Sequence, residues 1–364
     1  MKIKKQSTGY IMIFTLMLIA LLTVLVSYLA NRSTPYLSFI NIVVQRKKAK
    51  LLGLGGIQMA MSQLASAESE KKKTAVPKEK EEKEKEKSEE QGKRLLQAIL
   101  PSINRWQTVV LDEEKDGIEG KISFAITCEE GKIDINQIYD FESKKFVGEG
   151  EPEDDYKKII QEFFAIVEKK IGGQKLFDAL ATFLKNRDYK LNDVTELLTI
   201  KAFEVFKNNI FYVPPQPEKE QPDRQQKATV YLTDIFTVWS GSKTVEPWLL
   251  SNSMCGLLNL EQAQAGDVEK RKSAVKKWLA AFKQTAKWDE DWDKMLEPVY
   301  GKNFNTIPKF IKPILSTKFG PTVFSVLSYG KVGEVTQRFL AIIEKEKPEQ
   351  NGRAIVKLKK LYWL

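Results

Sequence analysis

The 364-residue chain contains no histidine. Histidine is the side chain that most often acts as a general base, activates a serine or cysteine nucleophile, or ligates a metal ion. Without it, only a mechanism based on carboxylates or lysine stays open, such as that of a glycoside hydrolase. We therefore interpret the chain as a non-enzymatic protein and keep a membrane-anchored enzyme that uses carboxylates or lysine as an alternative.

Cysteine is nearly absent as well. Cys128 and Cys255 are the two cysteines of the chain, and no CxxC pair occurs. Two thiols cannot form a structural zinc site on their own. In an oxidising compartment they could form one disulfide, Cys128–Cys255. Because their separation gives that bond no geometric support, two separate buried thiols are the favoured interpretation.

The excess of positive charge is spread rather than concentrated. Lys and Arg total 58 against 48 Asp and Glu, which gives a net charge of +10. A basic balance often indicates nucleic acid or an anionic membrane as partner. No stripe of arginines with interleaved aromatic residues is present, so we expect no nucleic-acid partner. Apolar residues make up 42% of the chain, enough for a packed core.

One long apolar run stands near the N-terminus. Residues 10–30 read YIMIFTLMLIALLTVLVSYLA, and no charge occurs between Lys5 and Arg32. A helix of this length spans roughly 30 Å, the thickness of a bilayer core. A cleaved secretory signal has a shorter apolar run and ends in a small-residue site. We therefore predict a retained, single-pass anchor. Lysine and arginine flank it on both sides, so charge alone does not fix its orientation.

The pattern after the anchor predicts a long helix, then strands, then helices, then strands. The stripe of apolar residues continues to residue 66, although Gly53, Gly55 and Gly56 weaken the helix by about 1 kcal/mol each. Residues 67–93 are a charged, low-complexity linker or a solvated helix. Alternation predicts strands at 118–127, 321–329, 335–344 and 353–363, and residues 131–138 are expected to form a hairpin with the first of them. Amphipathic periodicity predicts helices at 156–170, 176–184, 194–207, 268–285 and 307–316.

These elements predict an α+β fold, in which a long N-terminal helix packs on a small antiparallel sheet and a helical subdomain is inserted between strands. The expected divisions are a basic leader at 1–9, the helix at 10–66, the linker at 67–93, the first part of the sheet domain at 94–150, the inserted helical subdomain at 151–320, and the last strands at 321–364.

The N-terminal arrangement resembles a prepilin leader. Ser7-Thr8-Gly9 ends the basic stretch and Tyr10 begins the apolar run directly. Position five counted from Tyr10 is Phe14, where most pilins and pseudopilins carry Glu. With local similarity in QRKKAKLLGLGGIQMAMSQL at 45–64, GKIDINQI at 131–138, TELLTI at 195–200 and YLTDIFTVWSGSKTVEPWLL at 231–250, the chain resembles the minor pseudopilins of the general secretion pathway protein K family, from type II secretion systems. The segment Val245–Trp248 departs from that pattern.

The resemblance implies a pilin-like structural subunit. It implies cleavage between Gly9 and Tyr10 by prepilin peptidase with methylation of the product, an inner-membrane anchor, and a periplasmic bulk. Other minor pseudopilins would be its partners in a hetero-oligomer at the tip of the pseudopilus, where it would initiate or cap assembly. Because an unpaired carboxylate in lipid is costly, a subunit with Phe14 in place of Glu needs no neighbour above it. The alternatives are a membrane-anchored extracytoplasmic binding protein and a minor pilin of a type IV pilus.

Calcium stays open as a ligand, because some K subunits carry it, and no other cofactor is required. Two acidic clusters would suit oxygen coordination, but neither has the spacing of an EF-hand loop, and we assign no ligands. They comprise Glu151, Glu153, Asp154 and Asp155, and Asp289, Glu290, Asp291 and Asp293. Tryptophans 239, 248, 278, 288 and 292 are interpreted as core residues with a satisfied polar edge rather than as a binding surface.

Overall fold

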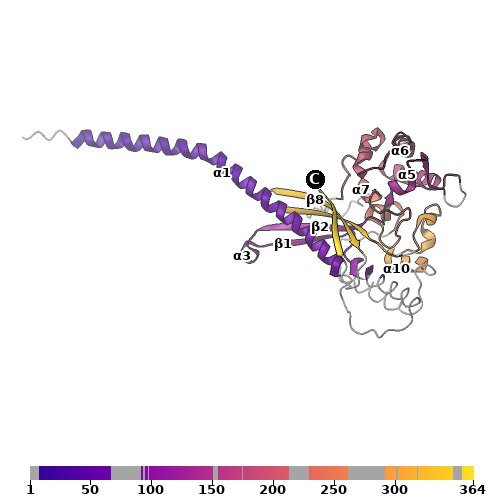
Figure 1. Ribbon diagram of the computed structural model, residues 1–364. Coiled ribbons are helices and arrows are strands. Elements are labelled where there is room, and N and C mark those ends of the chain that lie inside the picture. Colours follow the sequence, from indigo (N-terminus) through magenta and orange to yellow (C-terminus); the bar gives the residue numbers. More distant parts are fainter. Residues whose placement is uncertain are drawn as a thin grey trace, which may run out of the picture.

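In the computed structural model, a long helix carries a mixed α/β head (Figure 1). The residues that the structure describes are 8–66, 92, 95–96, 98–150, 155–173, 175–212, 229–260, 292–300, 302–317, 319–346 and 355–364. The predicted helix at 268–285 and most of the charged segment 67–93 lie outside these residues.

The first element is a single 59-residue helix, α1 (Thr8–Ser66). Figure 1 shows its N-terminal half projecting away from the head and its C-terminal half lying along the sheet. In the second half, Ala49, Leu52, Ile57, Ala60 and Leu64 are buried in the core. One helix therefore serves both as a free apolar rod and as one layer of the head.

The head is built on one antiparallel sheet of five strands in the order β1-β2-β7-β8-β9. The strands are β1 (Trp106–Leu111), β2 (Gly120–Cys128), β7 (Val323–Val332), β8 (Val335–Glu346) and β9 (Ile355–Trp363). The short helix α3 (Glu113–Asp116) connects β1 to β2. The predicted strands near 118–127 and 321–363 thus share one sheet, and the α+β fold class is confirmed. Strand β1 was not anticipated from the sequence.

The two faces of the sheet have different coverings. Even-numbered residues of β2 and β7, such as Phe124 and Ser328, face α1, and odd-numbered residues such as Ala125 and Ser325 face the other way. Since the strands have period two, this alternation places one set of side chains against the helix and the other against the inserted helices. The central strand β7 is buried over nine of its ten residues because both of its faces are covered.

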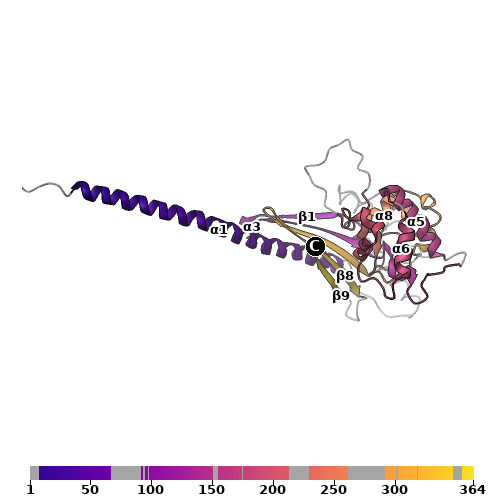
Figure 2. The same ribbon diagram turned by 90° about the horizontal axis from the view of Figure 1, so that it is seen from above.

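The chain leaves the sheet after Cys128 and returns at Val323. Figure 2 shows that the helices between these two points lie at one end of the sheet, and that the projecting half of α1 extends from the other end. They are α4 (Ile135–Ile138), α5 (Tyr156–Ile171), α6 (Leu176–Lys185), α7 (Leu232–Ile235), α8 (Asn252–Leu257) and α10 (Leu296–Tyr300), with 3-10 helices η1 (Val194–Thr199), η2 (Lys201–Phe206), η4 (Trp292–Met295), η5 (Phe304–Thr306) and η6 (Lys312–Ile314). We call residues 129–322 the helical block.

A phenylalanine cluster holds this block together. Phe163 and Phe164 of α5 contact Phe236, and Phe164 also contacts Phe177 of α6 and Phe203 of η2, with ring centroids 5.3 to 6.4 Å apart. These rings are the buried face of the amphipathic pattern at 156–170, and α5 and α6 form where helices were predicted. Helix α5 ends at Gly172, whose φ of 79° closes it in the left-handed conformation.

Three sequence expectations are wrong in detail. Residues 131–138 form no hairpin with β2; the two-residue strand β3 (Ile133–Asp134) pairs in parallel with β6 (Phe236–Thr237), and α4 follows. The reason is that Asp134 caps α4 through the N–H of Asn136, whose side-chain amide in turn hydrogen-bonds both backbone groups of Leu191.

Residues 194–207 form two 3-10 helices rather than one α-helix, and residues 307–316 contain only the short η6. Two further short strands, β4 (Tyr139–Asp140) and β5 (Lys145–Phe146), pair with each other.

Helix α1 approaches the sheet at backbone distance because glycines line the contact. A Cβ at Gly53 would lie 2.7 Å from the Phe339 ring, and one at Gly330 would overlap the backbone of Ala49 and Gly53. The Ser328 hydroxyl donates a hydrogen bond of 2.7 Å to the carbonyl oxygen of Gly53. The glycines that weaken the helix by propensity therefore have a packing role.

This contact predicts opposite effects for neighbouring glycines of α1. Gly56→Ala is expected to destabilise the head by about 1–3 kcal/mol, because its Cβ would overlap the Ser328 hydroxyl and lie 3.0 Å from Ile122. Gly55→Ala is the matched control: its Cβ meets nothing closer than 3.8 Å, so it should gain about 1 kcal/mol of helix propensity. Chemical unfolding of the full chain in detergent measures both, and equal effects of the two variants would contradict the close contact.

Candidate functional site

The projecting half of α1 has the length and composition of a membrane span. Met12–Ala30 has a mean hydropathy of 2.5 over 19 residues, and none of it is buried against the rest of the protein. The hydroxyls of Thr15 and Thr23 donate to the helix carbonyls of Met12 and Ile19, at 3.0 and 2.8 Å. Those polar groups are thus satisfied within the helix, as a lipid environment requires. A single N-terminal apolar helix of this kind fits a single-pass membrane anchor.

The predicted processing residues lie at the start of this helix. Gly9 and Tyr10 are in the first turn of α1, and Tyr10 is 82% exposed. Phe14 follows one turn later and is also exposed. The structure therefore places the Gly9–Tyr10 bond at the far tip of the projecting helix, well away from the head (Figure 1). The cleavage itself stays a prediction.

On the sheet face away from α1, a cavity of about 250 Å³ lies between the strands and the helical block. Ala125 and Thr127 of β2, Ser325 and Leu327 of β7, and Leu340 and Ile342 of β8 form its floor. Its other walls come from 193–195, 211–212 and 233–239 in the block, from Tyr362 of β9 and from Leu364 just after it.

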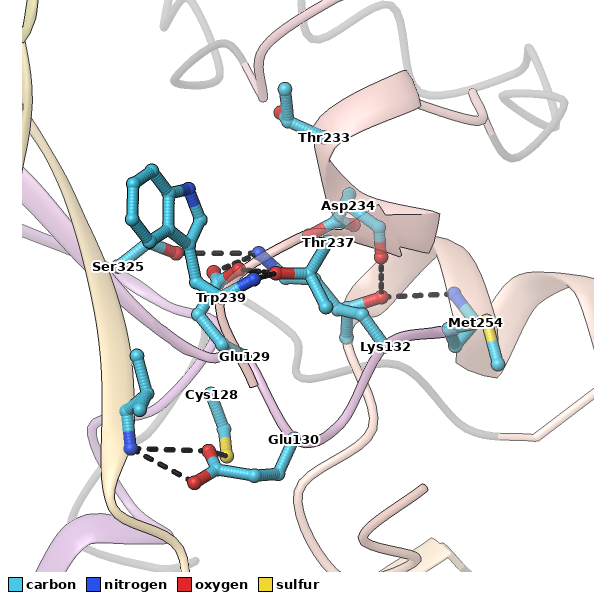
Figure 3. Close-up of polar contacts among 12 residues, drawn as sticks. Cys128, Glu129, Glu130, Lys132, Thr233, Asp234, Thr237, Trp239, Met254 and Ser325 are labelled. Carbon is cyan, nitrogen blue, oxygen red and sulfur yellow. Dashed lines mark hydrogen bonds and ion pairs between the residues drawn. The ribbon is translucent and has the colours of Figure 1, made fainter. Parts of the chain in front are cut away.

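A buried ion pair forms the polar end of the cavity (Figure 3). The Lys132 ammonium donates to Glu129, and both side chains are only 4% exposed. Lys132 also lies 3.3 Å from the Ser325 hydroxyl, and the Thr237 hydroxyl donates to the other oxygen of Glu129. Since a buried charge is tolerable only when it is paired and hydrogen-bonded, this network fixes β6 and the β2–β3 connection together.

Three further ionisable groups with shifted pKa values line the same cavity. Burial raises the pKa of Asp234, although the positive charge of Lys132 and the N–H of Ser253, 2.8 Å away, act against that rise. Burial and the nearby Asp234 carboxylate raise the pKa of Tyr212 to about 12. The Tyr362 hydroxyl has its pKa raised by burial and by Asp193.

A second polar cluster lies beside the first but outside the cavity. Glu130 accepts hydrogen bonds from the backbone N–H groups of Thr322 and Val323 and from the Thr322 hydroxyl, at 2.6 to 3.2 Å. The Cys128 thiol donates to Glu130 at 3.3 Å. Glu246 is buried close by, and within the described part of the chain its Oε1 has no hydrogen-bond partner. Burial first, and the repulsion of Glu130 second, raise the Glu246 pKa well above its ordinary value.

The two cysteines are separate buried thiols in the structure, and the Cys128–Cys255 disulfide is not formed. Cys255 lies in α8 and directs its sulfur towards the Leu250 carbonyl oxygen at 3.8 Å. Burial and the neighbouring carboxylates Glu130 and Glu246 also raise the Cys128 pKa, so this thiol is a poor nucleophile.

The acidic clusters considered for calcium fall mostly outside the described residues, except Asp155 and Asp293. Asp155 caps α5 by accepting from the Lys158 N–H. Within the part of the chain that the structure describes, no group of three or more acidic or cysteine side chains is arranged to hold a metal.

The sequence did not reveal the cavity. Trp248 is fully buried in the core, whereas Trp239 borders the cavity, and Trp278 and Trp288 lie outside the described residues. The available signal was the sequence Cys128-Glu129-Glu130-Gly131-Lys132, which places three charges directly after a buried strand. Charges in such a position indicate a paired, buried network rather than a solvated turn.

No protein-family model matches the chain, and no curated protein matches its sequence. Among solved structures, the chain is similar to one in the crystal structure of the GspK-GspI-GspJ complex from the type 2 secretion system of enterotoxigenic Escherichia coli. The match covers 78% of this chain and 96% of that chain, at 10% identity and a TM-score of 0.37. The function of this chain is therefore inferred from its own helix, sheet and leader.

The buried Glu246 predicts a pH dependence of stability. Burial favours its protonated form, so the folded state keeps this proton to higher pH than the unfolded chain does. The free energy of unfolding should therefore fall as the pH rises above the ordinary value of 4.5. Glu246→Gln should be more stable than the parent chain at neutral pH, by a margin that grows between about pH 5 and pH 8.

Denaturant unfolding at several pH values measures this margin. Glu119→Gln is the control, because Glu119 is an exposed residue of the β1–β2 connection. A margin that shrinks as the pH rises would show that Glu246 is ionised and stabilising in the folded head.

Proposed function

We propose that this chain is a minor pseudopilin of a type II secretion system, of the K kind, and that it forms the tip of a short periplasmic filament. The observation that carries the proposal is the unbroken course of α1, from an exposed span of membrane length into a half that packs on an antiparallel sheet. A structural subunit of this shape works by helix packing, not by chemistry.

The proposed topology follows from the leader. Residues 1–9 would remain in the cytoplasm until prepilin peptidase cuts after Gly9, residues 10–30 would lie in the inner membrane, and the head would lie in the periplasm. The exposed apolar side chains of the span, from Tyr10 to Leu29, would then contact lipid before assembly and the helices of other minor pseudopilins after it.

Two features support a position at the tip. Phe14 gives the span no carboxylate that would need the amine of a subunit above it. The helical block occupies the end of the sheet farthest from the span, where it would obstruct a further subunit (Figure 2). We infer initiation or capping of the filament as the specific role.

A catalytic role has less support. Glu129, the most buried carboxylate of the cavity, already has both oxygens engaged by Lys132 and Thr237. The buried network with Lys132 and Thr237 thus accounts for this carboxylate without a catalytic task. We propose a non-enzymatic protein that requires no cofactor.

Processing at Gly9 tests the pseudopilin proposal. When the full chain is co-expressed with a prepilin peptidase, the mature protein should begin at Tyr10, because the leader's glycine is the expected cleavage position. Intact-mass measurement and N-terminal sequencing read the product directly. Gly9→Val should leave the chain uncut, whereas Gly55→Ala, a change in the same helix distant from the leader, should be cut like the parent.

A mature protein that still begins at Met1 would contradict the proposal and favour a membrane-anchored binding protein. Cleavage combined with loss of surface pili, but with undisturbed protein secretion, in a deletion strain would identify a type IV minor pilin instead.

A further inference from the structure

The cavity beside the sheet has features that tip assembly does not use. Its floor is the sheet face away from α1, so it takes no part in the helix packing on which the proposed function rests.

The cavity carries an excess of negative charge. Among the described residues, Glu129, Asp193 and Asp234 line it together with one cationic side chain, Lys132. The Glu129–Lys132 pair is neutral, and with the Lys360 ammonium beside the cavity's rings counted as well, one carboxylate remains in excess. Asp234 is 7% exposed, and its oxygen Oδ2 accepts from a backbone N–H at 2.8 Å, which leaves it further acceptor capacity. A cation is the ligand charge that such a wall favours.

Aromatic rings stand beside these carboxylates. Tyr212 lies close enough to Asp234, and Tyr362 to Asp193, for each carboxylate to raise the pKa of the neighbouring phenol. Trp239 borders the same space, next to the Glu129–Thr237 contact (Figure 3). At the rim, the Lys360 ammonium already lies 5.8 Å from the Trp239 ring centroid and 5.6 Å from that of Tyr362. These rings thus face positions where a cation is attracted to the π electrons.

Part of the cavity lining is apolar. Leu327, Leu340 and Ile342 form an apolar part of the sheet floor and Phe236 of β6 adds an apolar face from the block, while the small residues Ala125 and Ser325 on the floor leave the space open. The volume of about 250 Å³ exceeds that of the ~150 Å³ apolar cavities that accommodate benzene. There is thus room for one ring-sized apolar body with a charged head group.

We propose that this cavity is a binding site for a small organic cation, in which an ammonium group is held between Asp234 and the aromatic rings and an apolar body lies on Leu327, Leu340 and Ile342 of the floor. Free amines of low molecular weight have this chemistry. The site would let the head respond to a soluble compound.

Three probes of nearly the same shape test the charge preference: 2-phenylethylammonium, neutral 2-phenylethanol and anionic phenylacetate. Each is titrated into the full chain in detergent and followed by calorimetry or by the fluorescence of the tryptophans. The ammonium should bind about tenfold or more tightly than the alcohol, and phenylacetate should bind most weakly.

Variants then locate the site. Asp234→Asn should reduce the preference for the ammonium over the alcohol, and Trp239→Leu should do the same while keeping an apolar wall. Glu119→Gln changes an exposed residue of the β1–β2 connection that does not line the cavity, and it should leave all three affinities unchanged. The comparison of probes in the parent chain does not depend on whether a variant folds.

Several results would overturn the proposal. Equal affinity for the ammonium and the alcohol would mean that the cavity is only an apolar void. Tighter binding of phenylacetate would mean that Lys132 rather than the carboxylates governs the site. Absence of ammonium binding at about 10 mM would mean that the cavity is not a ligand site.

Discussion

The close approach of α1 to the sheet is the constraint on which the rest of the structure depends. Gly53 lies against the Phe339 ring, Gly330 against the helix backbone, and Ser328 donates to the Gly53 carbonyl. A helix held at this distance cannot slide or rotate without backbone overlap. Because the same helix continues into the apolar span, the orientation of the head relative to the span is fixed by these few small residues.

The sheet, in turn, depends on a contact between segments far apart in sequence. Strands β2 and β7 are neighbours, but the whole helical block separates them along the chain. Glu130, two residues beyond β2, accepts from the backbone of Thr322 and Val323 where β7 begins. Asn104 and Asn252 add a second tie between the segment before β1 and helix α8. The point of exit and the point of return are therefore joined by hydrogen bonds, which sets the register of the central pair.

The sequence predicted the parts of the fold that periodicity controls. The apolar run at 10–30, the helix at 156–170 and the strands at 118–127 and 321–363 have strong period-3.6 or period-2 patterns, and each appears in the structure. The segment at 131–138 also alternates, but capping by Asp134 and the paired amide of Asn136 direct it into α4 instead. Local hydrogen bonds of this kind decide between structures that a hydrophobic pattern leaves equivalent.

The candidate site was less predictable because it is made by tertiary contacts. Nothing in the local sequence indicates that Gly53 and Gly330 meet. Glycine propensity alone therefore predicts only a weaker helix, whereas these glycines allow its close contact with the sheet. Similarly, Glu129 and Asp234 are more than one hundred residues apart in the chain, and only the parallel pairing of β3 with β6 brings their segments together. The charged triplet after β2 was visible, but its partners were not.

The cavity follows from a difference in side-chain size between the two faces of the sheet. On the α1 face, Phe124, Phe324 and Phe339 fill the space up to the helix and are almost completely buried. On the other face, Thr127 and Ser325 are cross-strand neighbours, with Ala125 next to them, and these small side chains leave space below the helical block, which Ser325 meets only through the long Lys132 side chain. If the head served only to block further subunits, larger apolar residues there would stabilise it by about 25 cal/mol for each Å² of apolar surface removed from water. Instead the space is retained and lined with charges whose burial is itself costly. The retained space and the buried charges both lower stability. A binding site requires this combination, whereas a purely structural block does not.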